Sequence, residues 1–218
     1  MKLKEWMTPG RVVYVLLAAA PFIIGAAVYS RMPERMAVHW NGAGVPDNYA
    51  PRAFALFGIP GITLALNVFA QVVIAHDPKR ERLRHARALL GLVKWMLVLL
   101  PLFVQILMVA HVWMPGKLDV GMLCSLGIGL LLTAMGNYLP KCPPNYTVGI
   151  RLPWTLADED NWKKTHRLGG YVMMAGGLLL TVTALTPWKA AAAVLVPAMV
   201  LIPCGYSFYL YKKSKKRP

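Results

Sequence analysis

Long apolar runs alternate with polar segments along this chain of 218 residues. Six of the runs approach the roughly 20 residues that an α-helix needs to cross the hydrocarbon core of a bilayer. The pattern therefore predicts an all-α, polytopic membrane protein, a bundle of six transmembrane helices. We place the helices at Val12–Tyr29, Ala53–Ala75, Ala88–Met114, Val120–Gly136, Gly169–Leu185 and Lys189–Leu210. The first run has a basic start but no small-residue cleavage site, so we expect it to be a retained helix and not a signal peptide.

Composition agrees with a membrane protein and changes how the charge is interpreted. Hydrophobic residues make up 57% of the chain and charged residues 15%, whereas soluble domains have roughly 25% charged residues. The net charge of +15 would suggest nucleic-acid binding in a soluble protein. Here 18 Lys and Arg residues fall on one side of the predicted bundle and five on the other, with Lys94 inside the third helix. The positive-inside rule then predicts a membrane protein with both termini in the cytoplasm and no direct nucleic-acid partner.

Two long polar segments interrupt the apolar pattern. The first, residues 31–52, is named the HWN loop after His39, Trp40 and Asn41, and the charge distribution predicts that it faces outward. The second, the 136–168 loop, is predicted to be cytoplasmic. We treat 1–218 as one integral membrane domain with an N-terminal half, 1–114, and a C-terminal half, 115–218. Each half has three helices, so an inverted repeat is a hypothesis.

The 136–168 loop is predicted to be a structured element at a membrane face. Its prolines, tryptophans and mixed charges could not lie exposed in hydrocarbon, where broken backbone leaves polar groups unpaired. A short interfacial helix should begin near Leu156 and carry Trp162. The guanidinium of Arg151 needs a carboxylate or carbonyl partner if it is partly buried, and Asp158 and Glu159 are the candidates.

The same loop resembles the signature of the SdpI immunity-protein family. A second block, from His39 to Tyr49, resembles an element of the uncharacterised domain that commonly forms the N-terminal half of this family. One departure is Leu152, where the family often has Thr. The residues that carry the first resemblance are Gly136, Asn137, Leu139, Pro140, Lys141, Pro144, Asn145, Gly149, Ile150, Arg151, Pro153, Trp154, Thr155, Leu156, Trp162, Lys164, Thr165, His166, Arg167 and Gly170.

The resemblance implies a location in the bacterial cytoplasmic membrane, a function and a set of partners. Members of this family are known as immunity proteins against a membrane-active peptide toxin that collapses the proton motive force. In the founding pair, the immunity protein with toxin present also holds an ArsR-type repressor at the membrane and so derepresses its own gene. The implied partners are thus the lipid bilayer, a peptide toxin and such a repressor. A small transporter or channel-like protein, or a purely signalling receptor, are the alternatives.

Each polar loop has a functional and a structural interpretation. The HWN loop could bind the toxin through His39, Trp40, Asn41 and Asp47, or it could be a cap that closes the outer end of the bundle. The 136–168 loop could be a docking platform or gate, or an interfacial structure that only completes the fold. Its candidate residues for structure or partner docking are Asn137, Pro140, Asn145, Gly149, Arg151, Trp154, Trp162, Lys163, Lys164, His166 and Arg167.

Few polar residues lie within the predicted helices. Asn67 and Gln71 are four residues apart and share a helix face, and Lys94 enters the membrane from the same side. These three side chains could meet, and a buried intramembrane Lys is by default a functional candidate. Alternatively, Lys94 extends its ammonium to the lipid headgroups. Because the sequence contains no metal-ligand spacing, phosphate loop or hydrolase motif, we expect no metal, no cofactor and no enzymatic activity.

The charge asymmetry predicts the result of cysteine-accessibility labelling. In a background without the three native cysteines, a cysteine at Ala43 should react with an impermeant reagent in intact cells. A cysteine at Ala157 should react only after the membrane is permeabilised, because the basic side stays inside. The reverse pattern would show that the orientation is wrong.

Overall fold

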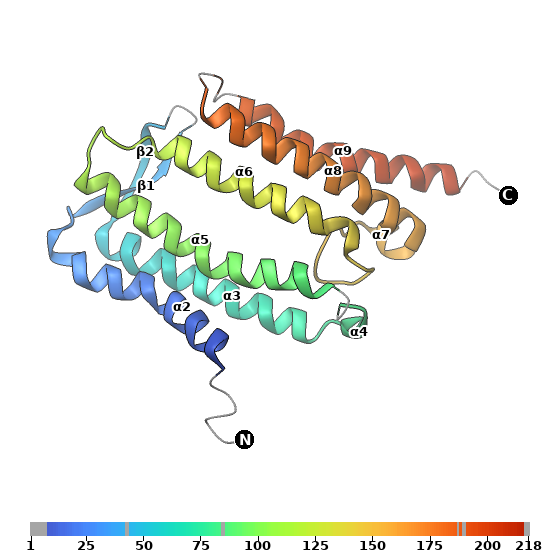
Figure 1. The fold of residues 1–218 in the computed structure, drawn as a ribbon, viewed down its shortest axis with the longest axis horizontal. Coiled ribbons are helices and arrows are strands. Elements are labelled where there is room, and N and C mark those ends of the chain that lie inside the picture. Colours follow the sequence, from blue (N-terminus) through green and yellow to red (C-terminus); the bar gives the residue numbers. More distant parts are fainter. Residues whose placement is uncertain (1–7, 42–43, 84–85, 187, 189–190, 216–218) are drawn as a thin grey trace. The chain divides into compact units, whose positions relative to one another are not determined.

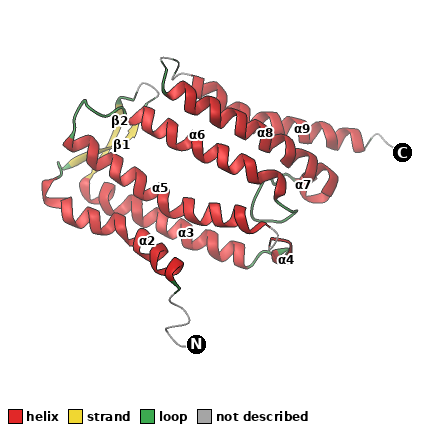
Figure 2. Ribbon diagram, in the orientation of Figure 1, coloured by secondary structure: helices red, strands yellow, loops and turns green. Residues whose placement is uncertain are grey.

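The computed structural model describes residues 8–41, 44–83, 86–186, 188 and 191–215. Figure 1 shows their order along the chain, and Figure 2 shows that helices dominate. Ala43 and Lys189, which the sequence analysis used, lie outside the described residues. The elements in chain order are α2 (Pro9–Val28), η1 (Tyr29–Arg31), β1 (Arg35–Trp40), β2 (Pro46–Pro51), η2 (Phe54–Gly58), α3 (Ile59–Ala75), α4 (Arg80–Leu83), α5 (Arg87–Trp113), α6 (Val120–Tyr138), η4 (Leu139–Lys141), α7 (Pro153–Ala157), α8 (Glu159–Ala184) and α9 (Ala192–Ser214).

Within the described residues, six helices are long and apolar enough to span a membrane, which confirms the predicted fold class. Five of them follow the predicted runs to within a few residues at each described end. The exception is α8, which begins at Glu159 and not near Gly169. Its first turns are polar because they pack against protein rather than lipid, so an apolar run could not reveal them. The six segments are Pro9–Arg31, Phe54–Ala75, Arg87–Trp113, Val120–Lys141, Glu159–Ala184 and Ala192–Ser214.

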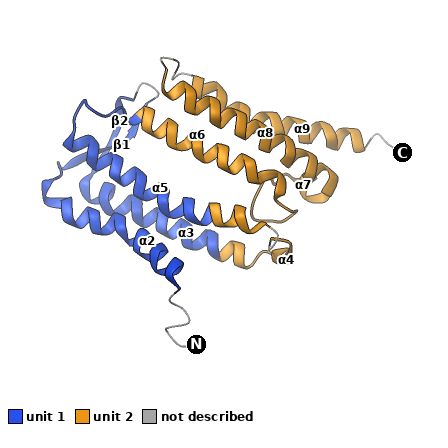
Figure 3. Cartoon of the chain, viewed as in Figure 1, with its two compact units in different colours: residues 1–71, 93–120 blue, residues 72–92, 121–218 orange. Residues whose placement is uncertain are grey.

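The chain divides into two compact units, coloured separately in Figure 3. Unit 1 comprises residues 1–71 and 93–120, and unit 2 comprises residues 72–92 and 121–218. Unit 1 thus contains α2, the hairpin and most of α3 and α5, while unit 2 contains α4, nearly all of α6, and α7 to α9.

The HWN loop forms a two-stranded antiparallel β-hairpin, which the sequence analysis did not predict. Strands β1 and β2 pair from Arg35 with Pro51 to Trp40 with Pro46. Asn41 closes the turn, because its backbone N–H and its side-chain oxygen both bond Val45. Six-residue strands with irregular register give too short an alternating pattern to be recognised within a polar segment.

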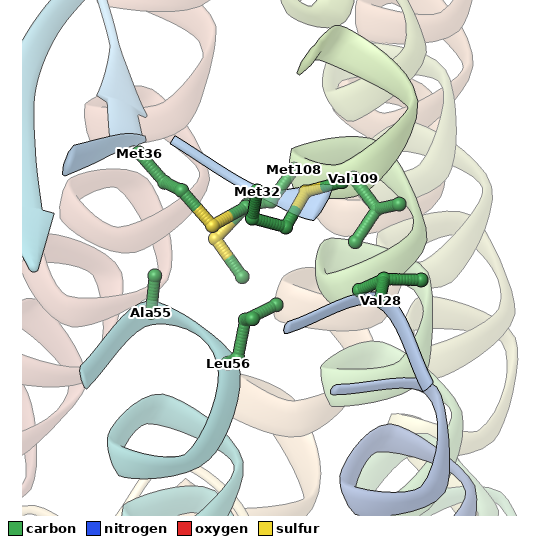
Figure 4. Close-up of a cluster of buried hydrophobic side chains, with 7 residues drawn as sticks. All are labelled: Val28, Met32, Met36, Ala55, Leu56, Met108 and Val109. Atoms are coloured by element: carbon green, nitrogen blue, oxygen red, sulfur yellow. The ribbon is translucent and has the colours of Figure 1, made fainter. Parts of the chain in front are cut away.

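The hairpin packs onto the ends of the unit 1 helices through a methionine-rich core (Figure 4). Met36 from β1 meets Met32, from the segment after η1, and Met108 from α5, and each of the three side chains is at most 3% exposed. Unbranched thioethers fill irregular gaps well, as where a hairpin meets three helix ends. The buried members of this core are Val28, Met32, Met36, Ala55, Leu56, Met108 and Val109.

In unit 2, glycines bring α6 and α8 into close backbone contact. A Cβ atom on Gly136 would lie 2.7 Å from the carbonyl oxygen of Gly170, and one on Gly177 would lie 2.6 Å from that of Gly129. Small residues at a helix interface let backbones approach closely, which is a main source of helix association in lipid.

We predict that Gly136→Ala destabilises the protein, whereas Gly205→Ala does not. The new methyl group at Gly136 would overlap the backbone of α8, and overpacking of this kind costs about 1–3 kcal/mol. A Cβ on Gly205, in α9, meets nothing within 4 Å. Thermal unfolding in detergent should show a melting temperature several degrees lower for Gly136→Ala only. Equal shifts for the two variants would contradict close packing of α6 and α8.

Candidate functional site

The segment between η4 and α7 is held by two buried polar side chains. Asn145 is fully buried, and its carboxamide nitrogen donates to the carbonyls of Pro143 and Val148 at 2.8 and 2.9 Å. Its oxygen accepts from the backbone N–H groups of Thr147 and Val148 at 2.8 and 2.6 Å. A single Asn thus satisfies four backbone groups, which defines the turn.

Asp77, which follows α3, holds the same turn from outside it. One carboxylate oxygen accepts from the Tyr146 N–H at 2.9 Å and from the Thr147 hydroxyl at 2.5 Å. The other accepts from the Lys79 N–H at 2.7 Å. Asp77 is only 6% exposed, so these charge-assisted bonds replace its lost hydration. Its segment is thereby joined to the 136–168 loop within unit 2.

His166 fixes the next part of the loop onto α8. Its ring is fully buried and stacks on Trp162, with the ring centres 3.9 Å apart. The Ile150 N–H donates to Nε2 at 3.0 Å, so Nε2 carries no hydrogen. Nδ1 therefore carries the proton and donates to the Trp162 carbonyl at 2.9 Å. The Trp162 indole donates to the Cys142 carbonyl at 2.8 Å.

Gly149 makes this arrangement sterically feasible. Its φ is +115°, a conformation that side chains disfavour, and a Cβ there would overlap His166 Nε2.

Short helix α7 is tied to α8 and α9 by a buried hydrogen-bond network. Trp154 Nε1 donates to the Ser207 hydroxyl, which donates to Asn161 Oδ1, both at 2.8 Å. Asn161 also donates to the Ser207 carbonyl at 3.0 Å, and Thr165 donates to Asn161 Oδ1 at 2.9 Å. A satisfied buried network specifies one arrangement of its elements.

Two predictions about the 136–168 loop are wrong. Trp162 is not on a separate interfacial helix, because α7 ends at Ala157 and Asp158 starts α8 by accepting from the N–H groups of Asp160 and Asn161. Arg151 has a carbonyl partner, one of the two kinds that were predicted, because it donates to the Tyr146 carbonyl at 2.5 Å. It is exposed, however, and neither of the predicted carboxylates pairs with it. Asp158 is used as the helix cap, and Glu159 pairs with Arg82.

The exposed surface of this part of unit 2 carries positively charged side chains. Lys163 and Arg167 are exposed, and Lys164 pairs with Asp160 at 2.6 Å while remaining 45% exposed. Asn137 is exposed in the last turn of α6, and Pro140 in η4 packs against Gly170. The loop therefore combines a fixed, buried interior with an exposed basic surface.

Cys142 has the wrong environment for a nucleophile. Burial, together with the nearby charge of Asp77, raises the pKa of its thiol to about 11, although Asn145 Nδ2 donates to the sulfur. The thiol is therefore neutral near pH 7.

In unit 1, the hairpin brings His39 and Asp47 together. His39 Nδ1 lies 2.5 Å from the Asp47 carboxylate, and both side chains are exposed. Trp40, in contrast, is half-buried, with its ring edge-on to His111 at 5.4 Å. Asn41 is exposed but closes the turn. The hairpin thus has one side that packs and one side, including Val45 and Tyr49, that is exposed.

Tyr14 joins two of the three intramembrane polar residues. Its hydroxyl donates to Asn67 at 2.8 Å, and the Lys94 ammonium lies 4.5 Å from the centre of its ring. Lys94 is thus directed toward α2. Gln71 Nε2 is buried without a hydrogen-bond partner.

Several residues of the site were missed by sequence reasoning. Asp77 was not among the predicted site residues, because it lies outside the 136–168 loop and its partners are about 70 residues away. Asn161 and Ser207 were not among the candidate residues, and Thr165 was named only as one of the residues that carry the family resemblance. The spacing of Asn161 and Thr165 by four residues was the only available signal.

The six spans and the ordered 136–168 loop define a multi-pass membrane protein. We call the buried hydrogen-bonded residues of this loop, centred on Asn145, Asn161 and His166, the polar platform. Residues 141–207, which contain nearly all of this platform, match the SdpI/YfhL protein family, and residues 16–64 match a domain of unknown function (DUF1648). The chain is 23% identical over 205 residues to Immunity protein SdpI of Bacillus subtilis (strain 168), covering 93% of this chain and 96% of that protein. The chain is thus similar to proteins of the SdpI family, which is not a known enzyme family. No solved structure matches it.

We predict that Gly149→Ala destabilises the protein more than Gly116→Ala. Both glycines have positive φ, +115° and +72°, so both variants carry a backbone cost of about 1–3 kcal/mol. Only the Gly149 variant would also displace His166, since a Cβ on Gly116 meets nothing within 4 Å. Thermal unfolding of the two variants compares them directly. A Gly149→Ala melting temperature equal to or above that of Gly116→Ala would refute the role of the His166 contact.

Proposed function

We propose that this chain is a membrane immunity protein that protects the cell producing it from a membrane-active peptide toxin. The observation that carries the proposal is the similarity to Immunity protein SdpI, which extends over nearly the full length of both chains. The charge asymmetry of the sequence supports an orientation with the hairpin outside and the 136–168 loop in the cytoplasm.

The hairpin is the part of the proposed outer side that is best suited to meet a peptide. Val45 and Tyr49 have exposed fractions of 55% and 47%, and aromatic side chains are frequent binding hot spots. Exposed His39 and Asp47 add a polar pair beside them. Trp40 is a poorer first contact, because its ring packs on His111.

The 136–168 loop supports a second proposal, that a cytoplasmic repressor of the ArsR type docks on unit 2. The exposed cations Lys163, Lys164 and Arg167 lie on α8. The buried side of this helix is held in place by the hydrogen bonds of His166 and Asn161. Because this surface is already ordered before a partner binds, binding loses little conformational entropy.

A survival assay tests immunity, and a recruitment assay tests docking of the repressor. Expression of this chain should protect a Bacillus subtilis strain that lacks Immunity protein SdpI against the toxin that kills that strain. The double variant Val45→Ser, Tyr49→Ser should tolerate about tenfold less toxin, as expected for the loss of one hot spot of about 1.4 kcal/mol.

The matched control is Lys163→Ala with Lys164→Ala. It should leave survival unchanged but reduce recruitment of a fluorescently labelled repressor to the membrane. Survival no better than with an empty vector, at equal membrane abundance, would refute immunity. Loss of survival in the lysine variant would show that protection and recruitment are not separated between the two surfaces.

A further inference from the structure

The start of α8 and the last turns of α9 form a cavity within unit 2. The hydrogen bond from the Asn161 side chain to the Ser207 carbonyl shows that these two helix ends lie side by side. The cavity has a volume of about 200 Å³. A bound water needs only roughly 10–15 Å³, so the space admits a small organic group.

Most polar groups that line the cavity are already bonded within the protein. Lys164 pairs with Asp160 at 2.6 Å, so these two charges offset each other. The side chain of Asn161 bonds Ser207. The Ser214 hydroxyl donates to a backbone carbonyl of its own helix. These groups shape the cavity, but they do not carry the recognition of a ligand.

Two lining groups of opposite charge are left. Asp158 accepts the N–H groups that begin α8 through Oδ1 alone, and in the described part of the chain its Oδ2 atom has no partner. The ammonium of Lys213 lies 6.0 Å from the centre of the Tyr209 ring, at the outer limit of a cation–π contact. Among the described residues, no ion pair joins Asp158 to Lys213. One cavity is therefore lined by a carboxylate oxygen and an ammonium that do not neutralise each other.

The lengths of the two helices put this cavity at the level of the lipid headgroups. Helices α8 and α9 have 26 and 23 residues, more than the roughly 20 that cross the hydrocarbon core. The polar first turn of α8 and the lysine-bearing last turn of α9 are the parts that extend beyond the core. Leu210 gives the cavity an apolar wall as well.

We propose that this cavity binds the headgroup of a phosphatidylethanolamine molecule from the surrounding membrane. Its phosphate would lie on Lys213 and its ammonium on Asp158 Oδ2. Lysine is a common binder of phosphate, and a primary ammonium has N–H groups that a carboxylate accepts. Both charges of the headgroup are then paired with a charge of the protein.

The lining residues select against two other common headgroups. Phosphatidylcholine has a quaternary ammonium, which has no N–H to donate and is recognised by aromatic faces. No aromatic side chain is among the described residues that line the cavity. Phosphatidylglycerol has a phosphate but no ammonium, so it would leave the carboxylate of Asp158 unpaired beside a second negative charge.

Native mass spectrometry of the full-length protein in detergent, with one lipid added at a time, tests this selection. With dioleoyl chains throughout, phosphatidylethanolamine should bind about tenfold more tightly than phosphatidylcholine or phosphatidylglycerol, as expected for one hydrogen bond between charged groups. Soluble glycerophosphoethanolamine has the same headgroup without acyl chains. It should bind about tenfold or more weakly than the lipid, because it gains no apolar contacts.

Two single variants should each abolish the preference for phosphatidylethanolamine. They are Lys213→Ala and Asp158→Asn, and the second removes the charge but keeps the helix cap, since Asn caps as well as Asp. Lys212→Ala is the matched control. Lys212 is also exposed on α9, but it does not line the cavity, so its variant should keep the preference.

Four results would overturn the proposal. Equal binding of the three lipids by the wild-type protein is the first, and a preference that persists in folded Lys213→Ala and Asp158→Asn is the second. The third is loss of the preference in Lys212→Ala, which would show a general effect of positive charge. Binding of glycerophosphoethanolamine as tight as that of the lipid is the fourth, because the ligand would then be a soluble zwitterion. Thermal unfolding in detergent establishes that each variant is folded.

Discussion

The neutral imidazole of His166 is the contact on which the 136–168 loop depends. It accepts from the Ile150 N–H with one nitrogen and donates to the Trp162 carbonyl with the other. Both nitrogens are used, so the ring cannot turn without leaving two buried groups unpaired. The requirement for Gly149 follows from the same contact, since any Cβ there would overlap the ring. The loop is thereby built onto α8, whose early start at Glu159 provides the surface for it.

The two units differ in how well their buried polar groups are hydrogen-bonded. In unit 2, side chains of Asn145, Asn161 and Asp77 reach nearly ideal partners, which favours a single arrangement. In unit 1, prolines lie in three helices. The carboxamides of Asn67 and Gln105 reach the carbonyls of Leu97 and Leu56, four residues before Pro101 and Pro60, only at 3.4 and 3.5 Å. A fixed platform suits docking of another protein. The more loosely bonded helices of unit 1 carry the hairpin that we propose as the surface for the toxin.

Much of the site was predictable as a region but not as a set of contacts. The prolines, tryptophans and mixed charges of the 136–168 loop predicted that it is structured. The carboxylate candidates for Arg151 were wrong, because nearness in the sequence favoured Asp158 and Glu159 over the Tyr146 carbonyl. In the structure, Asp158 caps α8, and Glu159 pairs with Arg82, which is distant in the sequence. Asp77 was missed altogether, because its role depends on residues about 70 positions away.

The sequence by itself determined the class of protein, the number of spans and most of their ends. Hydrocarbon excludes unpaired backbone, so apolar runs of sufficient length have essentially one outcome. Tertiary structure decided the rest. The hairpin is stabilised because Met36 packs into the core with Met32 and Met108. Helix α8 begins early because its polar first turns hydrogen-bond to Ser207 and to the 142–150 segment. These features depend on contacts between residues that are distant in the sequence, so no local sequence pattern predicts them.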